Sequence, residues 1–320
     1  MALFRRRALL AAPCMALPTM AHAQAPRPIR FIVPFAAGGL TDIITRLVAQ
    51  HMAQTLDQTI VVENRPGGNA IIASEAVARA PKDGLTVLVG GTAGLPINVL
   101  LRPNLPYRLE DFAPVSLLFD GPLSLTVNAE LPTRDVAAFA AFARAARDPL
   151  RYATNGPGSV SHLFGILMSE AMGIRLTDVP YRGNAQSTTD LLAGQIEISV
   201  EAPTTTIEHV RAGKLRLLAL SFAERAPLLP DVPTFKESGY PNLVAGFWTG
   251  LLCPAGTPQD VVTRLNDAAS KAMESDGIRT RLATEALRAR SGPPTLLQQQ
   301  MAADTAQWGR IIREKHITLE

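Results

Sequence analysis

Hydrophobic and polar positions along the chain alternate between a strand-like and a helix-like pattern. Short apolar runs have the length of buried strands, and we expect strands at residues 29–33, 59–63, 85–89, 114–118, 123–128, 150–154, 177–180, 196–200, 215–220 and 247–252. Segments with apolar residues at helical spacing separate them, and we expect helices at 42–56, 70–80, 136–147, 159–172, 185–193, 205–212, 258–274, 277–286 and 295–314. This alternation predicts an α/β protein with largely parallel sheets, and the proline-rich segment 226–240 is expected to be an ordered loop.

One local design, a strand that runs through a glycine-containing turn into a helix, occurs twice. The first copy contains VPFAAGGLTD (the first corner, residues 33–42), and the second contains YATNGPGSVSH (the second corner, residues 152–162). Ligands of open α/β sheets bind beyond the carboxyl ends of the strands. We therefore expect the corners to come from two domains and to face each other across a cleft.

The N-terminal residues have the features of a secretory signal peptide. Three arginines at 5–7 precede an apolar run at 8–20, and Ala21, His22 and Ala23 form an AxA cleavage site. We expect a leader at residues 1–23, cleavage after Ala23 and an exported, soluble protein. Lipidation at Cys14 is the alternative, although the preceding Ala-Ala-Pro is a poor context for it.

The net charge and the cysteine content of the chain both change when the expected leader is removed. The whole chain has 31 basic and 28 acidic residues, and removal of the leader leaves 28 of each. The net positive charge therefore belongs to the leader, and neither nucleic acid nor an anionic membrane surface is expected as a partner. Cys253 is the only cysteine outside the leader, so no intramolecular disulfide can form, and its apolar context LLCPAG indicates a buried, inert thiol.

The first corner has the composition of an anion-binding turn. Its small residues allow a ligand to approach the backbone, and the following helix N-terminus favours negative charge. A purely structural connection, with Thr41 or Asp42 as N-cap, is the alternative. The corner contains neither GxGxxG nor GxxxxGK[ST], which disfavours a nucleotide.

The second corner leaves two interpretations open. Ser159 and His162 could serve a serine hydrolase, but the stretch reads GPGSV rather than GxSxG, and no third group is identifiable to orient the imidazole. A serine at 159 or 161 that caps the helix or binds a ligand is favoured. The histidines outside the leader are dispersed and HExxH is absent, so neither a metal nor another cofactor is expected.

Eight motifs in order carry a family resemblance: VPFAAGGLTD, VVENRPGG, KDGLTVLVG, LPYRLEDFAPV, YATNGPGSVSH, VPYRGNAQSTTDLLAGQIEIS, LPDVPTFKESGYP and FWTGLLCPAGTP. Together they make the chain resemble the Bug family of TctC-like solute-binding proteins, the periplasmic receptors of tripartite tricarboxylate transporters. The resemblance implies a monomeric binding protein without catalysis and a type II periplasmic-binding fold. That fold has two α/β lobes joined by crossover strands, at 24–125 plus 246–320 and at 126–245.

The resemblance also implies a site and partners. A small carboxylate would be held by backbone N–H groups and hydroxyls of the two corners, at Ala37, Gly38, Gly39, Asp42, Thr154, Asn155, Gly158 and Ser159. Two helix N-termini converging on one carboxylate supply about one unit of positive charge, so no Lys or Arg is required. The partners would be membrane subunits of the transporter, or a membrane sensor as the alternative.

Three positions bear on which ligand is bound. Leu40 stands where the family commonly has a small or polar residue, which would narrow the pocket, and Glu201 stands where it more often has aspartate. We expect Asp42 to cap a helix and Glu201 to lie in a solvated loop. The alternative is that one of these carboxylates receives an amine, amide or hydroxyl group of the ligand.

Overall fold

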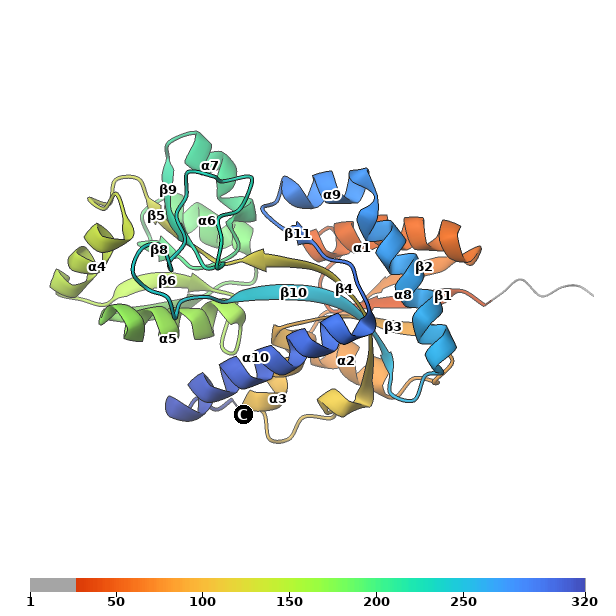
Figure 1. Ribbon diagram of the computed structural model, residues 1–320. Helices are drawn as coiled ribbons and strands as arrows, with labels where there is room; N and C mark the ends of the chain where they lie inside the picture. The colour runs from red at the N-terminus through yellow and green to blue at the C-terminus, as the bar shows by residue number, and fades with distance from the viewer. Residues whose placement is uncertain (1–26, 320) are drawn as a thin grey trace, which may run out of the picture.

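The computed structural model describes residues 27–319, so the expected leader lies outside the described residues. Two sheets form two lobes (Figure 1). The first sheet has the order β11-β4-β10-β3-β1-β2, with β1 (Ile29–Val33), β2 (Ile60–Asn64), β3 (Thr86–Gly91), β4 (Phe112–Pro122), β10 (Gly246–Pro254) and β11 (Arg288–Ala289). The second has the order β7-β6-β8-β5-β9, with β5 (Ser124–Asn128), β6 (Leu150–Thr154), β7 (Leu176–Pro180), β8 (Ile198–Ser199) and β9 (Leu215–Leu220).

Each sheet is parallel on one side and antiparallel on the other. Strands β1, β2 and β3 pair in parallel, as do β6, β7 and β8, whereas β4, β10, β11, β5 and β9 pair with antiparallel neighbours. The long strands β4 and β10 run between the lobes (Figure 1). Because the chain enters the second lobe along β4 and returns along β10, these two strands must run in opposite directions. The expected α/β fold with two lobes and crossover strands is confirmed, but both sheets are mixed rather than largely parallel because of the antiparallel crossover strands.

Helices cover both faces of each sheet. Their apolar residues recur at helical spacing and form a stripe that each helix buries against the sheet. In the first lobe, α1 (Leu40–Leu56), α8 (Gln259–Glu274) and α9 (Asp276–Ala283) cover one face, and α2 (Ile71–Ala78) with part of α10 (Pro294–Glu314) covers the other. In the second lobe, α4 (Val136–Ala145) and α5 (Val160–Met172) contribute to one cluster and α6 (Asn184–Leu192) to another, with the short α7 (Ile207–Arg211) at the margin. The short α3 (Asn98–Leu101) follows β3 of the first lobe, and its Leu101 joins the main apolar cluster of the second lobe. Cys253 is buried, and burial raises the pKa of its thiol to about 12, as expected for an inert cysteine.

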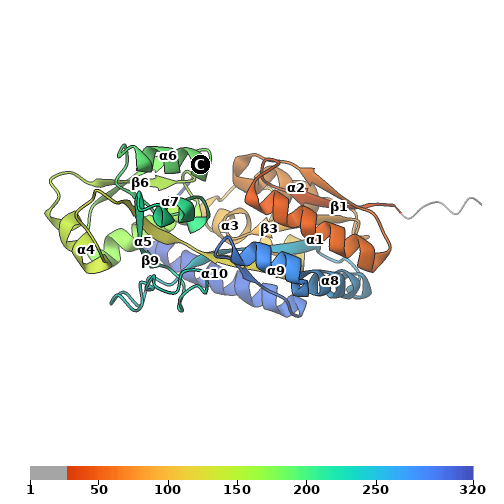
Figure 2. The ribbon, with the colours of Figure 1, turned by 90° about the horizontal axis from the view of Figure 1, so that it is seen from above.

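Helix α10 belongs to the cores of both lobes. Leu297 and Met301 pack with the first lobe, whereas Trp308, Ile311 and Ile312 join the main apolar cluster of the second. Both views show this helix alongside the two lobes (Figures 1 and 2). The two lobes are therefore connected by a shared helix as well as by crossover strands.

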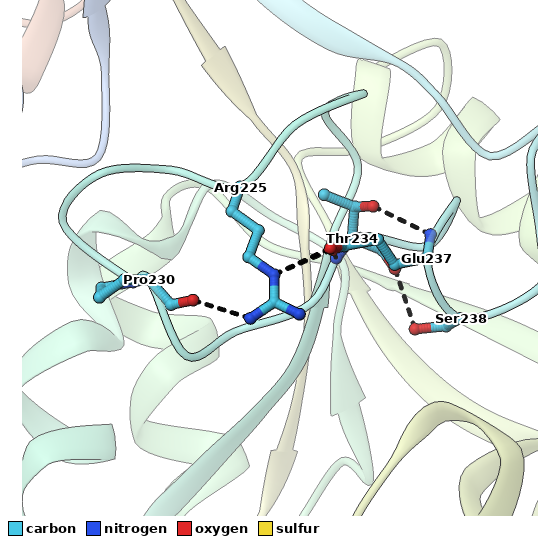
Figure 3. A network of polar contacts seen from close by, with 5 residues as sticks. All are labelled: Arg225, Pro230, Thr234, Glu237 and Ser238. Atoms are coloured by element: carbon cyan, nitrogen blue, oxygen red, sulfur yellow. Dashed lines mark hydrogen bonds and ion pairs between the residues drawn. The ribbon is translucent and has the colours of Figure 1, made fainter.

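The proline-rich segment after β9 is ordered by its own polar contacts, as expected (Figure 3). The Arg225 guanidinium donates to the Glu237 carboxylate at 3.0 Å and to the Pro230 carbonyl at 2.8 Å. Glu237 in turn accepts from the backbone N–H of Thr234 at 2.7 Å, and the Thr234 carbonyl accepts from the Ser238 hydroxyl. These bonds give the loop one conformation without a regular helix or strand.

Candidate functional site

Both corners lie at the carboxyl edge of a parallel set of strands. In the first lobe, β1 and β2 end in register at Val33 and Asn64, and the first corner begins there. In the second lobe, β6 and β7 end in register at Thr154 and Pro180. The loops that follow these strands are therefore grouped at one edge of each sheet, as expected for ligand-binding loops.

Asp42 holds the turn of the first corner in shape. Its carboxylate accepts a hydrogen bond from the Gly38 N–H at 2.9 Å and an ion-paired bond from Arg46 at 2.9 Å. The Asn64 amide donates both to Asp42 at 2.9 Å and to the Phe35 carbonyl at 3.0 Å, which ties the end of β2 to the turn. Burial by itself would raise the pKa of Asp42, but the bonds from Arg46, Gly38 and Asn64 outweigh burial and hold this pKa below its usual value.

The start of helix α1 differs from expectation. The helix begins at Leu40 with Gly39 as N-cap, so neither Thr41 nor Asp42 is the capping residue. From the first turn of α1, the Asp42 carboxylate reaches back and accepts from the Gly38 N–H. Arg46, four residues further along the helix, also donates to this carboxylate and stabilises its position. Leu40 is half-buried and packs against the core of the first lobe. Every oxygen of Asp42 is thus engaged by the protein itself.

The second corner is a self-contained turn that caps α5. The Ser159 hydroxyl accepts from the His162 N–H at 3.2 Å, which confirms a serine cap. The Asn155 N–H donates to the Ser161 hydroxyl at 3.1 Å, and the Gly158 N–H donates to Nδ1 of His162 at 3.3 Å. Because Nδ1 must be unprotonated to accept this bond, the turn uses the neutral imidazole, and burial lowers the pKa of His162 despite an opposing contribution from Asp178.

These bonds change which N–H groups are available to a ligand. The N–H groups of Gly38, Asn155 and Gly158 are already used inside the corners. By contrast, no acceptor among residues 27–319 receives the N–H groups in the first turns of α1 and α5, at Leu40, Thr41, Val160 and Ser161. The sequence indicated both helix N-termini as the positive ends of the site but did not identify these backbone N–H groups individually, and of the four residues only Val160 was not named there.

The geometry does not support the hydrolase interpretation. The Ser159 hydroxyl lies 3.1 Å from the Ser161 hydroxyl, and its bond with His162 is to the backbone N–H rather than to the ring. The ring nitrogen Nδ1 is occupied by the Gly158 N–H. A serine nucleophile needs its hydroxyl hydrogen-bonded to the base, and this pair does not have that bond.

First-lobe elements also touch the second corner. Gly158 has φ +78°, and a Cβ atom there would lie 2.6 Å from Leu319 and 3.0 Å from Leu101 at the end of α3. The Leu319 N–H donates to the Leu101 carbonyl at 3.2 Å. Glycine is thus required both by the left-handed backbone and by this close approach. The contact places the segment that follows β3 against the second corner.

Glu201 occupies a position that sequence reasoning judged wrongly. The side chain is only 3% exposed, so the expected solvated loop is wrong. The Glu201 carbonyl accepts from the Ser124 N–H at 2.9 Å, and this bond to β5 draws the residue against the sheet. Its Oε2 accepts from the Ser187 hydroxyl at 2.6 Å and lies 3.4 Å from the Ser199 hydroxyl, whereas its Oε1 is buried and has no hydrogen-bond partner among residues 27–319. Burial raises the pKa of Glu201, although the serine bonds partly oppose this.

The VVENRPGG turn is more constrained than a simple connection. Gly67, Gly68, Asn69 and Ala70 all have positive φ, and two of them are not glycine. The conformation is held by Asn98, whose amide donates to the Asn69 carbonyl at 2.7 Å. Backbone strain of this kind requires a surrounding structure that fixes it, and the buried Asn98 provides that here.

Two further observations limit the chemistry of the described chain. Across residues 27–319, no group of three or more His, Cys, Asp and Glu side chains is arranged to hold a metal ion. None of the helices between these residues combines the length and the apolar character needed to cross a bilayer.

Comparison with known proteins gives the family. The model of the tripartite tricarboxylate transporter family receptor matches residues 44–317. The chain belongs to this family. BugT of Bordetella pertussis is 33% identical over 302 residues, which cover 94% of this chain and 93% of that protein. The resemblance to the Bug family is thereby confirmed, and the family is one of solute-binding receptors rather than of enzymes.

Solved structures agree with this assignment. MatC of Rhodopseudomonas palustris with bound malate superposes with a TM-score of 0.79 at 34% identity, over 90% of this chain and 99% of MatC. Rpa4515 of R. palustris with adipate gives a TM-score of 0.82 at 31% identity, over 92% of this chain and 99% of that chain. Both similarities extend over the two lobes described above.

Proposed function

We propose that this protein captures a small carboxylate between its lobes in the periplasm and delivers it, as a monomer, to membrane subunits of a tripartite tricarboxylate transporter. The observation that carries the proposal is the pair of strand–turn–helix corners, one in each lobe, within a member of this receptor family. Malate and adipate, the ligands in MatC and Rpa4515, are both dicarboxylates. The expected leader with cleavage after Ala23 supports export, and a membrane sensor remains the alternative recipient.

The proposed ligand contacts are the small residues Ala37, Gly38 and Gly39 of the first corner, with Asp42 as the residue that shapes the turn. The free N–H groups at the start of α1 supply its positive end. In the second lobe, Thr154, Asn155, Gly158 and Ser159 frame the ligand and α5 supplies the second positive end. Hydrogen bonds to a charged group contribute roughly 1.5–3 kcal/mol each, against about 4–15 kcal/mol lost on association, so a few such bonds give releasable binding.

Thermal denaturation with a panel of mono-, di- and tricarboxylates tests the proposal. A carboxylate ligand should raise the melting temperature and be recovered unchanged, and native mass spectrometry should show a monomer with one ligand. Turnover of the ligand, or no binding across the whole panel, would refute the proposed function.

The role of Asp42 is tested separately by calorimetry on Asp42→Asn. An amide oxygen can replace Oδ2 as the acceptor for Gly38 and Arg46, but the amide NH2 then faces the Asn64 and Arg46 donors that Oδ1 accepts in the unaltered protein, so the turn loosens and affinity should fall about tenfold. Asp135→Asn is the matched control, because Asp135 caps α4 by accepting from the Ala138 N–H at 2.7 Å and asparagine caps equally well. Equal loss of affinity in both variants would contradict this role.

A further inference from the structure

The carboxyl edge of the second sheet carries a group of buried hydroxyls around one acid. Thr154, Ser161, Ser187 and Ser199 are each at most 3% exposed and lie at or beyond the ends of β6 and β8 or on α5 and α6. Glu201 is the carboxylate among them. The charge of Glu201 is also felt by Tyr181, which follows β7 at the same edge.

The hydrogen bonds of Glu201 are one-sided. Both serine hydroxyls, from Ser187 and Ser199, approach Oε2, and no hydrogen-bond donor of the described chain reaches Oε1. An ion pair with lysine or arginine is also lacking among residues 27–319. A buried acceptor without a partner is costly, and the cost is larger when the group is charged, so a buried carboxylate that keeps one free oxygen calls for a specific explanation.

Asp42, the other carboxylate near a corner, does not share this property. Its oxygens are engaged by Gly38, Arg46 and Asn64. Of the two acids, only Glu201 therefore retains an acceptor that a ligand could use.

We propose that Oε1 of Glu201 accepts a hydrogen bond from an amino or hydroxyl group of the ligand, so that the protein prefers carboxylates that carry such a donor. This inference rests on the proposed function and specifies its ligand class. An ammonium or hydroxyl group fits the free oxygen because both donate, whereas a second carboxylate offers only acceptors unless a proton is added. Because Oε1 is enclosed, the proposed contact requires the Glu201 side chain to rotate or the surfaces around it to separate.

Three four-carbon acids isolate this contact. Succinate, malate and aspartate share one skeleton and differ by a hydrogen atom, a hydroxyl group or an ammonium group at one carbon. Calorimetry on the unaltered protein should give a dissociation constant at least about tenfold lower for malate or aspartate than for succinate. Glutarate, 2-hydroxyglutarate and glutamate repeat the comparison with one more methylene.

The variant Glu201→Gln tests the residue itself. Glutamine retains an acceptor for Ser187 but presents an amide donor or a neutral oxygen in place of the free carboxylate oxygen, so the preference should shrink to within about threefold. Glu197→Gln is the matched control, because Glu197 precedes β8 at the opposite end of the strand and pairs there with Arg151. This control should keep the preference of the unaltered protein.

The outcomes separate the two proposals. If carboxylates bind but succinate or another acid without a donor binds best, or if Glu201→Gln keeps the full preference, this inference is overturned and the proposed function stands. If no carboxylate binds, both are overturned. A crystal structure of the unaltered protein with the tightest of these acids tests the contact without a substitution, because the donor should lie within about 3.2 Å of Oε1. A donor that points elsewhere in that structure would also overturn the inference.

Discussion

Replacement of Asp304 by asparagine should make the folded protein more stable at neutral pH. Asp304 lies on α10, is 5% exposed and accepts hydrogen bonds from the Trp248 indole at 2.7 Å and from the Gln300 amide at 2.9 Å. Burial raises the pKa of Asp304 to about 6, and these bonds oppose the rise only in part. Asparagine keeps the size of the side chain and an acceptor for Trp248, but it carries no charge.

The size of the effect follows from the difference between the two states. The pKa of Asp304 rises from 3.8 in the unfolded chain to about 6 in the folded one, and each unit corresponds to about 1.4 kcal/mol, so about 3 kcal/mol is at stake. A raised pKa means that the folded state holds its proton longer than the unfolded state. The stabilising contribution is therefore complete below pH 3.8 and is lost as the pH rises through about 6.

Urea denaturation followed by circular dichroism between pH 4 and pH 8 measures this loss. The free energy of unfolding of Asp304→Asn, minus that of the unaltered protein, should increase by about 2 kcal/mol between pH 4.5 and 7.5. Asp267→Asn on α8 is the control, because Asp267 is exposed, and it should show no such gain. A constant difference between Asp304→Asn and the unaltered protein across the range would refute the reasoning.

Two further substitutions test the second corner and its support. In Gly165→Ala a Cβ atom would lie 2.2 Å from the Tyr152 ring, so the free energy of unfolding should fall by about 1–3 kcal/mol and the melting temperature should fall with it. Gly277→Ala on α9 is the control, because its Cβ atom would meet nothing within 4 Å, and it should be neutral or stabilising. Equal effects of the two substitutions would contradict this packing. Ser159→Ala should lose about 1 kcal/mol of stability by removing a cap and leave background ester hydrolysis unchanged, and loss of that hydrolysis would instead favour an enzyme.

The architecture was predictable because it depends on periodicity. Every expected strand and helix is present, since burial on a sheet face or a helix stripe requires apolar residues at fixed spacing, whereas the short α3 and β11 were not expected. The antiparallel pairing of β4 with β10 was not predictable from single segments. It arises because the chain crosses between the lobes twice, which is a property of connectivity rather than of local pattern.

The candidate site was predictable only in part. The corners stood out through their glycines, and the Asp42–Arg46 pair has an i,i+4 spacing that the sequence displays. The burial of Glu201 did not stand out, because it depends on Ser124 and Ser187, which are distant in sequence. Internal use of the Gly158 N–H also escaped prediction, since it depends on the orientation of the His162 ring.

The placement of α10 restricts how the two lobes can move relative to each other. Separation along the side of this helix would expose Trp308, Ile311 and Ile312, which are each at most 5% accessible now, and full exposure of an apolar side chain of this size costs about 1.5–3 kcal/mol. Leu101 and Leu319 add to this attachment, because both lie against Gly158 of the second corner. Any separation of the lobes is therefore most costly on the side of the molecule where α10 lies.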